Sequence, residues 1–437
     1  MRKLAVVVAL VACAGCGSEE ARLREALRSG TGLVRLPAGV VELSSELVIP
    51  KGARGLRLVG APSGTLLRAS KQFRGRAILR VEPGAFIMLS GFSIDGNRAA
   101  LEKPAGLPPS DVPFSRFTTS NGILAEGVTG LSISRVHLTN VAGFAILVSG
   151  SRDVVIQNIQ VDDSGSRNGR GRNNASGGIL LEEGAAGFRV LNSRLRNVRG
   201  NGIWTHSLYT SPRNREGLIA GNRFENIGRD AIQVGHATGI RVEKNTGARI
   251  GYPFAEVDVE GGGIPVALDT SGNVDQSVYA SNRFDEVDGK CIDLDGFHHG
   301  DVVDNRCTNR GAAGDYPYGH YGIVFNNSNP DMQSDEVTVA RNLIDGAKLG
   351  GIFVIGAGNR IVGNRLLHLN LAHNSDSGLL QSGIYLGAGA DRPAPAQDNV
   401  VQDNQISGYQ MSRRCIAAAP GVSIAANKVG ANRCSDQ

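Results

Sequence analysis

Strong net charge, aromatic residues and long apolar runs are all scarce in this sequence. The formal net charge of +5 is small for 437 residues, and its basic residues are scattered except for a local run from Arg167 to Arg172. This pattern predicts no nucleic-acid partner. The six cysteines show no zinc-type spacing. The apolar run from Leu4 to Ala12 is too short to span a bilayer permanently.

Glycine is abundant where proline and aromatic residues are rare. The chain has 59 glycines against 16 prolines, and it is 41% hydrophobic but only 5% aromatic. Such a composition is typical of many short strands joined by tight turns. It predicts an all-β chain.

The N-terminus has the pattern of a bacterial export signal. Met1-Arg2-Lys3 supplies the charged start and the following apolar run supplies the core, so residues 1–16 are expected to be a signal peptide. The segment that follows resembles a lipoprotein cleavage box, with either Cys13 or Cys16 as the lipidated residue. The chain is therefore expected to be an exported lipoprotein anchored to the outer membrane, periplasmic or at the cell surface, with a lipid as its only membrane attachment. A plain signal peptide, and hence a secreted protein, is the alternative.

Export makes disulfides possible among the remaining cysteines, Cys291, Cys307, Cys415 and Cys434. Cys291 and Cys415 occupy equivalent places in distant repeats, so a bond between them is not expected. Pairs 291–307 and 415–434 remain possible.

The first ordered residues read as a helix followed by strands. Glu20 to Ser29 carries apolar residues at helical spacing and ends at Gly30, and the strand-like segment from Leu33 contains the turn Leu36-Pro-Ala-Gly39. This succession resembles the opening of pectate-lyase-like β-helix proteins. The resemblance implies a capping helix within a spacer at 17–32 and a single-stranded right-handed parallel β-helix over 33–437.

A repeat runs through the chain from Asn121 onward. Each unit has an apolar anchor, an alternating strand, a glycine turn, a second strand and an asparagine. The anchors are Ile123, Ile146, Ile179, Ile203, Ile232, Val266, Ile292, Ile323, Ile352, Ile384 and Ile416. The asparagines are Asn158, Asn192, Asn222, Asn245, Asn282, Asn305, Asn342, Asn364, Asn404 and Asn427. Each repeat is expected to form one coil that stacks on the next, with the asparagines in left-handed turns and bonded along the coil axis.

Acidic residues concentrate at outward positions of the middle coils. Side chains alternate along a strand, so residues one and three after each anchor point outward and stack in columns about 4.8 Å apart. Counting from the anchors places Asp269 beside Asp295, with Asp293 two residues away on the same strand. Carboxylates this close require either a bound cation or a retained proton. We therefore expect either a Ca²⁺ site at Asp269, Asp293 and Asp295 or an acid/base pair among them, against the alternative of a solvated acidic surface.

Other residues near this patch suit carbohydrate chemistry. The catalytic candidates are Asp269, Asp293, Asp295, Lys290, His206 and Tyr321. The substrate-binding candidates are Trp204, Gln233, Asp230, His236, His298, His299, His320, Asn326 and Arg213. The tryptophan could stack on a sugar ring, whereas the histidines match no metal-binding motif and are interpreted as proton-transfer or hydrogen-bonding groups.

Signature motifs of the β-helix polygalacturonases and alginate epimerases are matched only loosely. Asp230-Ala-Ile232 and Gly319-His320-Tyr-Gly-Ile323 are similar to two of the four polygalacturonase signatures, but the acid pair and the Arg-Ile-Lys motif are missing. Phe297-His298-His299-Gly-Asp301 lacks the proline of the epimerase motif. These departures leave the reaction open.

Three functions follow from these observations. The favoured one is a Ca²⁺-assisted polysaccharide lyase that acts on a uronic-acid-containing glycan, with Lys290, Tyr321, His206 or an arginine as the base. A glycoside hydrolase that uses two of the aspartates needs no metal. A non-catalytic surface protein that binds glycans or acts as an adhesin is the third.

Overall fold

The computed structural model describes residues 18–104, 106–319, 321–375 and 381–436. The predicted signal peptide and lipidation site lie outside these residues. The chain forms two compact units, the first made of residues up to 201 together with 206–218, and the second of 202–205 together with 219–437. No helix among the described residues has both the length and the apolar character needed to cross a membrane.

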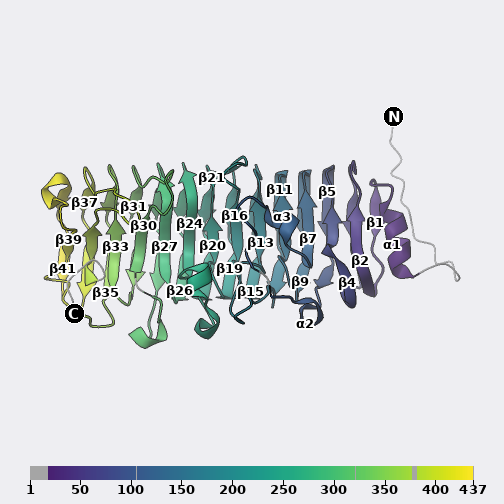
Figure 1. Ribbon diagram of the computed structural model, residues 1–437, viewed down its shortest axis with the longest axis horizontal. Helices are drawn as coiled ribbons and strands as arrows, with labels where there is room; N and C mark the ends of the chain where they lie inside the picture. Colours follow the sequence, from purple (N-terminus) through teal and green to yellow (C-terminus); the bar gives the residue numbers. More distant parts are fainter. Residues whose placement is uncertain (1–17, 105, 320, 376–380, 437) are drawn as a thin grey trace. The chain divides into compact units, whose positions relative to one another are not determined.

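The first unit begins with a helix and continues as stacked short strands (Figure 1). Its elements are α1 (Glu19–Leu27), β1 (Leu33–Arg35), β2 (Gly39–Ile49), β3 (Arg57–Val59), β4 (Thr65–Val81), β5 (Ala85–Ser90), β6 (Ser93–Asp95), α2 (Arg98–Leu101), α3 (Phe114–Phe117), β7 (Asn121–Glu126), β8 (Thr129–Ser134), β9 (His137–Thr139), β10 (Ile146–Ser149), β11 (Arg152–Gln157), β12 (Gln160–Asp162), β13 (Ile179–Glu182), β14 (Arg189–Leu191), β15 (Arg194–Val198) and β17 (Asn214–Arg215).

The second unit consists almost entirely of strands. Its elements are β16 (Ile203–His206, except its last residue), β18 (Leu218–Ala220, except its first residue), β19 (Arg223–Ile227), β20 (Ile232–Val234), β21 (Ala237–Thr238), β22 (Arg241–Glu243), β23 (Thr246–Ile250), η1 (Phe254–Glu256), α4 (Val259–Gly262), β24 (Val266–Asp275), β25 (Val278–Ala280), β26 (Arg283–Val287), β27 (Lys290–His298), β28 (Asp301–Val303), β29 (Arg306–Thr308), η2 (Ala313–Asp315), β30 (Tyr321–Asn326), β31 (Thr338–Ala340), β32 (Leu343–Asp345), β33 (Gly350–Val354), β34 (Arg360–Val362), β35 (Arg365–Leu369), β36 (Ile384–Leu386), β37 (Val400–Gln402), β38 (Gln405–Gly408), β39 (Ile416–Ala418), η4 (Ile424–Ala426), β40 (Lys428–Gly430) and β41 (Arg433–Ser435).

In both units every strand pairs in parallel with the equivalent strand of the next coil. In the first unit Ile123 lies opposite Ile146, which lies opposite Ile179. In the second unit Ile292, Ile323, Ile352, Ile384 and Ile416 follow one another in the same way. All of these except the last are fully buried, so the predicted anchors do form the apolar core of the coils. Both units are therefore parallel β-helices.

The predicted capping helix is α1. Ser18 accepts a hydrogen bond from the Ala21 amide and so caps the helix N-terminus. Leu23 and Leu27 are buried, while the Arg24 guanidinium donates to the carbonyls of Ser45 and Glu46 on β2. The helix thus covers the apolar end of the first coil and occupies backbone acceptors there.

Asparagines form a ladder along the second unit. The members are Asn222, Asn245, Asn282, Asn305, Asn342, Asn364, Asn404 and Asn432, and the side-chain oxygen of each from Asn245 onward accepts the backbone N–H of the one before it at 2.9–3.1 Å. The predicted bonding along the axis is confirmed for Asn222 to Asn404; Asn432 was not predicted, and the predicted Asn427 is bonded to Asn399 instead. The predicted left-handed backbone is present at Asn158 and Asn192, whereas in the ladder the left-handed residue is the one just before each asparagine, such as Lys244 and Ser281.

Two disulfides close the coils in which they lie. Cys291 on β27 is bonded to Cys307 on β29, and Cys415 is bonded to Cys434 on β41. These are the two pairings that the sequence left possible. Each joins two strands of a single coil of the second unit, so neither links distant repeats.

Candidate functional site

The strand register of the second unit places Asp269 directly opposite Asp293. Trp204, Gln233, Asp269, Asp293, Val324, Phe353 and Tyr385 form one column, each one residue after the buried anchor of its strand. Each of these side chains keeps between 6% and 9% of its surface exposed, so the column faces outward.

This register corrects the predicted neighbour of Asp269. Ser271, not Asp269, lies opposite Asp295, because the anchor in β24 is Leu268 and Val266 lies opposite Lys290. Val266 and Leu268 are both apolar and both buried, so the alternation in the sequence fixes the face of the strand but not its register. The acidic pair therefore consists of Asp269 and Asp293.

Each carboxylate of the pair has a specific donor. The Gln233 side-chain amide donates to Asp269 Oδ2 at 2.6 Å, across adjacent strands. The Lys290 ammonium bonds to Asp293 Oδ2 within one strand, while Asp293 Oδ1 is buried and has no hydrogen-bond partner among the described residues. The two acids are thus held by different kinds of group, an amide for one and a cation for the other.

A third acid, Asp230, completes the cluster. It lies two residues before Ile232 and accepts the backbone N–H of Val266 at 2.9 Å. The pKa of Asp230 is raised to about 6, mainly by burial and also by the charge of Asp293, while Arg229 and Lys290 oppose this. Asp230 was predicted as a substrate-binding residue, whereas the structure places its carboxyl in the electrostatic field of the acidic pair.

The electrostatics of the cluster favour a protonated carboxyl at Asp269. Burial raises the pKa of Asp269 well above its ordinary value, and the charges of Asp230 and Asp293 act in the same direction. Burial lowers the pKa of Lys290, but Asp293, Asp269 and Asp295 outweigh it, so the net shift is upward. The ammonium therefore stays charged beside Asp293.

Asp295 lies two residues further along β27 and has its own partners. Its Oδ1 accepts the backbone N–H of Ser328 at 2.9 Å, and its Oδ2 accepts the hydroxyl of the same serine. Burial raises the pKa of Asp295 against these bonds. Asn326, a predicted substrate-binding residue, lies opposite Asp295 on the next strand. These two residues form a polar extension of the acidic pair.

Tyr321 lies at the start of β30, one coil beyond Lys290. Its hydroxyl is buried and has no hydrogen-bond partner among the described residues. Burial raises the pKa of Tyr321, with a smaller contribution from Tyr385. The phenol is consequently held protonated, which suits a proton donor and not the base that was predicted.

Three of the predicted histidines lie at or just beyond the ends of β20 and β27. His298 is the last residue of β27 and His299 follows it, five and six residues beyond Asp293. His298 Nδ1 contacts the Gly296 carbonyl at 3.2 Å, and His299 faces Glu336. His236 lies in the turn after β20, against Gly272. His320 is outside the described residues.

The remaining predicted residues, His206 and Arg213, belong to the first unit. The His206 ring meets the Phe114 ring edge-to-face at 5.5 Å. Ligand atoms of Glu182, Glu183 and His206 lie within 4.8 Å of one another, an acidic cluster compatible with a metal ion. Arg213 stands in the loop before β17.

The predicted Ca²⁺ ligands do not form a good oxygen cage. Ca²⁺ requires six to eight oxygen ligands, whereas Asp293 is bonded to an ammonium, Asp269 to an amide N–H and Asp295 to a backbone N–H and a hydroxyl. A cation at the acidic pair would compete with Lys290. The donors present fit a proton-sharing pair better than a metal site.

Sequence reasoning found only part of the cluster of Glu182, Glu183 and His206. Glu182 and His206 are the outward residues three after the anchors Ile179 and Ile203, so the column argument placed them on neighbouring coils, but it gave them no shared role and did not reach Glu183. Glu182 is fully buried and accepts the backbone N–H groups of Phe114 and Ser115, both at 2.9 Å. This contact depends on a loop more than sixty residues earlier in the chain, which no local pattern reveals.

Comparisons with known proteins agree with the architecture. Residues 115–268 match the family model described as a right-handed beta helix region. The chain thus has the right-handed parallel β-helix fold that the sequence predicted. No curated protein matches the sequence.

Solved structures share this fold at low sequence identity. The N-terminal fragment of bacteriophage phi29 gene product 12 is 13% identical, with a TM-score of 0.64 over 93% of this chain and 69% of that one. The surface adhesin PfbA of Streptococcus pneumoniae is 14% identical, with a TM-score of 0.55 over 82% and 89%. A hyperthermoactive exopolygalacturonase from Thermotoga maritima is 12% identical, with a TM-score of 0.52 over 80% and 87%. At these identities the similarity concerns the fold alone.

Proposed function

We propose that this chain is an exported enzyme that hydrolyses glycosidic bonds in a polysaccharide, with Asp269 as general acid and Asp293 as nucleophile or base. The observation that carries the proposal is the side-by-side register of these two residues on β24 and β27, with the Lys290 ammonium on Asp293 and an amide N–H on Asp269. Glycoside hydrolysis uses a pair of carboxyl groups in two protonation states. Such a pair usually consists of two carboxyl groups that have different pKa values because their surroundings differ.

The chemistry follows from this asymmetry. Asp269, with its raised pKa, carries the proton that the departing glycosidic oxygen needs. Asp293, bonded to Lys290, supplies a carboxylate toward the anomeric carbon or a water. Adjacent parallel strands are about 4.8 Å apart, which is closer to the separation of roughly 5–5.5 Å in retaining enzymes than to that in inverting ones. The proposal therefore includes retention of anomeric configuration.

The same column supplies a surface for the sugar. Trp204 lies opposite Gln233, one coil before Asp269, and both keep a small exposed area. An indole face stacks on the apolar face of a pyranose, and an amide bonds to its hydroxyls. The fold similarity to an exopolygalacturonase agrees with a polysaccharide substrate.

Elimination, the reaction that the sequence favoured, is less well supported by the geometry. A lyase needs an unprotonated base for the C5 proton. Lys290 and Tyr321 both have raised pKa values and so hold their protons near neutral pH. The candidate base His206 lies instead beside Glu182 and Glu183. The Ca²⁺ ligation that a lyase would need at the aspartates also fits poorly.

Export is supported by two features besides the N-terminal sequence. Both disulfides belong to the class of bond that persists in oxidising compartments. A polysaccharide substrate is also extracellular in most settings, which agrees with an exported chain. The lipid anchor predicted at Cys13 or Cys16 would hold the enzyme at the outer membrane.

Metal binding is tested separately, because Glu182, Glu183 and His206 offer two carboxylates and an imidazole. Calorimetric titration with Ca²⁺ on the wild type, Asp295→Asn and Glu183→Gln distinguishes the two sites. The hydrolase proposal predicts that Ca²⁺ does not bind at Asp295, so Asp295→Asn should give the same heat as the wild type. Heat lost only in Glu183→Gln places the cation in the first unit.

The reaction is tested by incubating the protein with plant, algal and bacterial polysaccharides. Reducing ends without the ultraviolet absorbance of unsaturated sugars are expected, and NMR of the first product should show the substrate's own anomer. Asp269→Asn and Asp293→Asn should each lower kcat by at least about 10²-fold, whereas Asp285→Asn, an exposed acid on β26, should leave it unchanged. Unsaturated products would establish elimination instead. If no glycan gives a product, the function that remains is that of a non-catalytic glycan-binding protein.

A further inference from the structure

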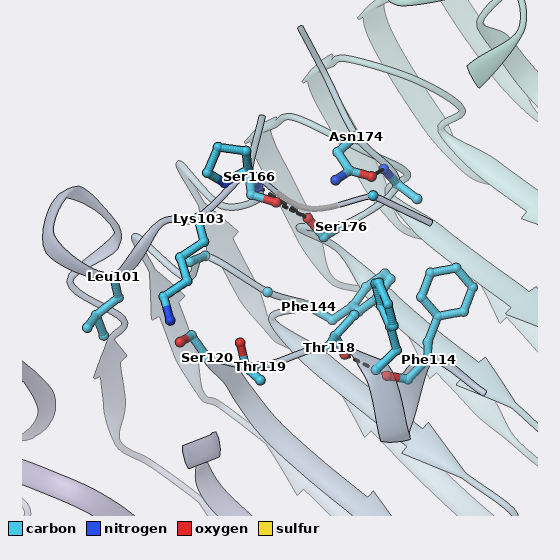
Figure 2. A pocket seen from close by; sticks show the side chains of 16 residues that line it. Leu101, Lys103, Phe114, Thr118, Thr119, Ser120, Phe144, Ser166, Asn174 and Ser176 are labelled. Carbon is cyan, nitrogen blue, oxygen red and sulfur yellow. Dashed lines mark hydrogen bonds between the residues drawn. The ribbon is translucent and has the colours of Figure 1, made fainter. Parts of the chain in front are cut away.

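The first unit contains a cavity that the proposed reaction does not use (Figure 2). It encloses about 240 Å³ between the loop that follows α2, the helix α3 and the loop that precedes β13. This volume lies below the roughly 300–1,000 Å³ of sites that bury drug-sized ligands. The cavity suits one ring-sized group.

One wall of the cavity is aromatic. Phe114 and Phe144 meet edge-to-face with their ring centroids 5.6 Å apart, and Phe117 lines the cavity with 38% of its surface exposed. Aromatic faces of this kind stack on the apolar face of a sugar ring. The wall therefore offers a place for a pyranose rather than for a small inorganic ion.

The opposite walls are polar. Ser166 and Ser176 bond to one another through their hydroxyls at 3.0 Å, and Thr119 and Ser120 add hydroxyls from the segment before β7. Figure 2 shows the Lys103 ammonium directed toward Ser120 and Thr119. Hydroxyl groups both donate and accept hydrogen bonds, so they match the hydroxyls of a sugar, while the ammonium matches an anionic substituent.

Buried polar side chains hold the walls in place. Asn121 is fully buried, donates to the Thr118 carbonyl at 3.3 Å and accepts the Phe144 N–H at 2.8 Å. Glu182 fixes Phe114 through its backbone N–H at 2.9 Å. The cavity is thus preorganised, which reduces the entropy lost on binding.

Positive charge surrounds the polar wall. The Glu102 carboxylate, next to Lys103, accepts the Arg199 guanidinium and the Arg167 backbone N–H, both at 2.7 Å. Arg98 lies close enough to Arg199 that burial and this second guanidinium together lower the pKa of Arg98. Three guanidinium groups, of Arg98, Arg167 and Arg199, and Lys103 therefore lie near only two carboxylates, those of Glu102 and Asp163. This local excess includes part of the basic run at 167–172 that the overall charge did not explain, and it favours an anionic ligand.

We propose that this cavity binds one acidic sugar residue of a glycan, with the ring against the phenylalanines and the carboxylate at Lys103. The site lies in the first unit, whereas the proposed catalytic pair lies in the second, so binding here does not depend on catalysis. It would hold a uronate-bearing chain to the protein whether or not that chain is the one cleaved.

The test is calorimetric titration with tetra-galacturonate and with its fully methyl-esterified form, in which each carboxylate is replaced by a neutral methyl ester. The Asp293→Asn variant serves as the background, so that no turnover contributes heat. The acidic form should bind, and the ester should bind at least about 5-fold more weakly, as expected for loss of a charge-assisted bond. Raising the salt concentration should reduce the difference between the two.

Four further substitutions locate the binding. Lys103→Gln should remove the preference for the acidic form, and Phe117→Ala should weaken both forms. Phe117 is exposed enough for its loss to leave the fold intact. Lys51→Gln, an exposed lysine in the turn after β2, should change nothing. The proposal is overturned if neither form binds, if both bind equally, or if Trp204→Ala abolishes the heat while Phe117→Ala does not. Failure to detect hydrolysis would leave these results unaffected.

Discussion

Replacing Lys290 by methionine isolates the ion pair on which the proposed acid/base asymmetry depends. The Lys290 ammonium is the cation bonded to Asp293, and its charge also lowers the pKa values of Asp230, Asp269 and Asp295. The side chains are only 18% and 8% exposed. Breaking a buried pair costs roughly 3–5 kcal/mol, and the partial exposure here places the expected loss at the lower end of that range.

A double-mutant cycle distinguishes the ion pair from general loss of packing. Lys290→Met, Asp293→Asn and the double variant are compared by urea unfolding at neutral pH. Each single substitution leaves one buried charge without its partner, so we expect each to cost about 3 kcal/mol and the double variant little more than either single. Lys348→Met is the matched control, because that ammonium donates to the Pro317 carbonyl at 2.8 Å and has no bonded carboxylate.

Catalysis supplies the second measurement in this test. Without the ammonium, the pKa of Asp269, the proposed general acid, rises further. The alkaline limb of the pH–rate profile, which reports that acid, should therefore move to higher pH by about one unit. Two results would refute the reasoning. The first is strict additivity of the two single losses, and the second is an unshifted pH–rate profile with a normal kcat in Lys290→Met.

Three other substitutions test separate parts of the structure. Asp230 has a native pKa of about 6 against an ordinary value of 3.8, so its contribution to stability is present below about pH 4 and is lost as pH rises through about 6. At 1.36 kcal/mol per pKa unit, this contribution is about 3 kcal/mol. Asp230→Asn should therefore flatten the decline of the free energy of unfolding with pH, measured by urea unfolding. Asn282→Ala removes the bonds that its amide donates to Val242 and Asn305 and leaves the buried backbone N–H of Asn245 without its acceptor, so it should cost about 2–4 kcal/mol in thermal unfolding. Asn273→Ala, at a partly exposed position outside the ladder, should cost less than about 0.5 kcal/mol. The Glu182 carboxylate accepts two backbone N–H groups, and Glu182→Gln sets the N–H₂ group of an amide against one of them. The loop before α3 should therefore be cleaved faster by protease. Glu25→Gln, on the exposed face of α1, is the control and should not change the rate.

The fold could be predicted from the sequence because the repeat is a local property of the chain. Anchors such as Ile323 and Ile352 recur with an asparagine at the end of each coil, and every coil must bury its apolar face on the next. The capping helix could also be predicted, because its apolar spacing and the glycines that follow it are both local signals.

The candidate site could be predicted only in part. Alternation placed Asp269, Asp293 and Asp295 on one face correctly, but two buried apolar residues in β24 left the register open by two positions. Partners that come from loops were not predictable. Ser328 reaches Asp295 from 33 residues away and Phe114 reaches Glu182 from 68, and no periodic pattern encodes these distances.

The asparagine ladder has a consequence for how such a chain can change. Successive rungs are separated by 23, 37, 23, 37, 22, 40 and 28 residues, yet the amide-to-oxygen bond between them stays at 2.9–3.1 Å. A loop elsewhere in a coil can therefore become longer or shorter without disturbing the hydrogen bonds of the ladder. Insertions in these loops can therefore change the ligand-binding surface during evolution, while the asparagine ladder and the stacked coils stay the same.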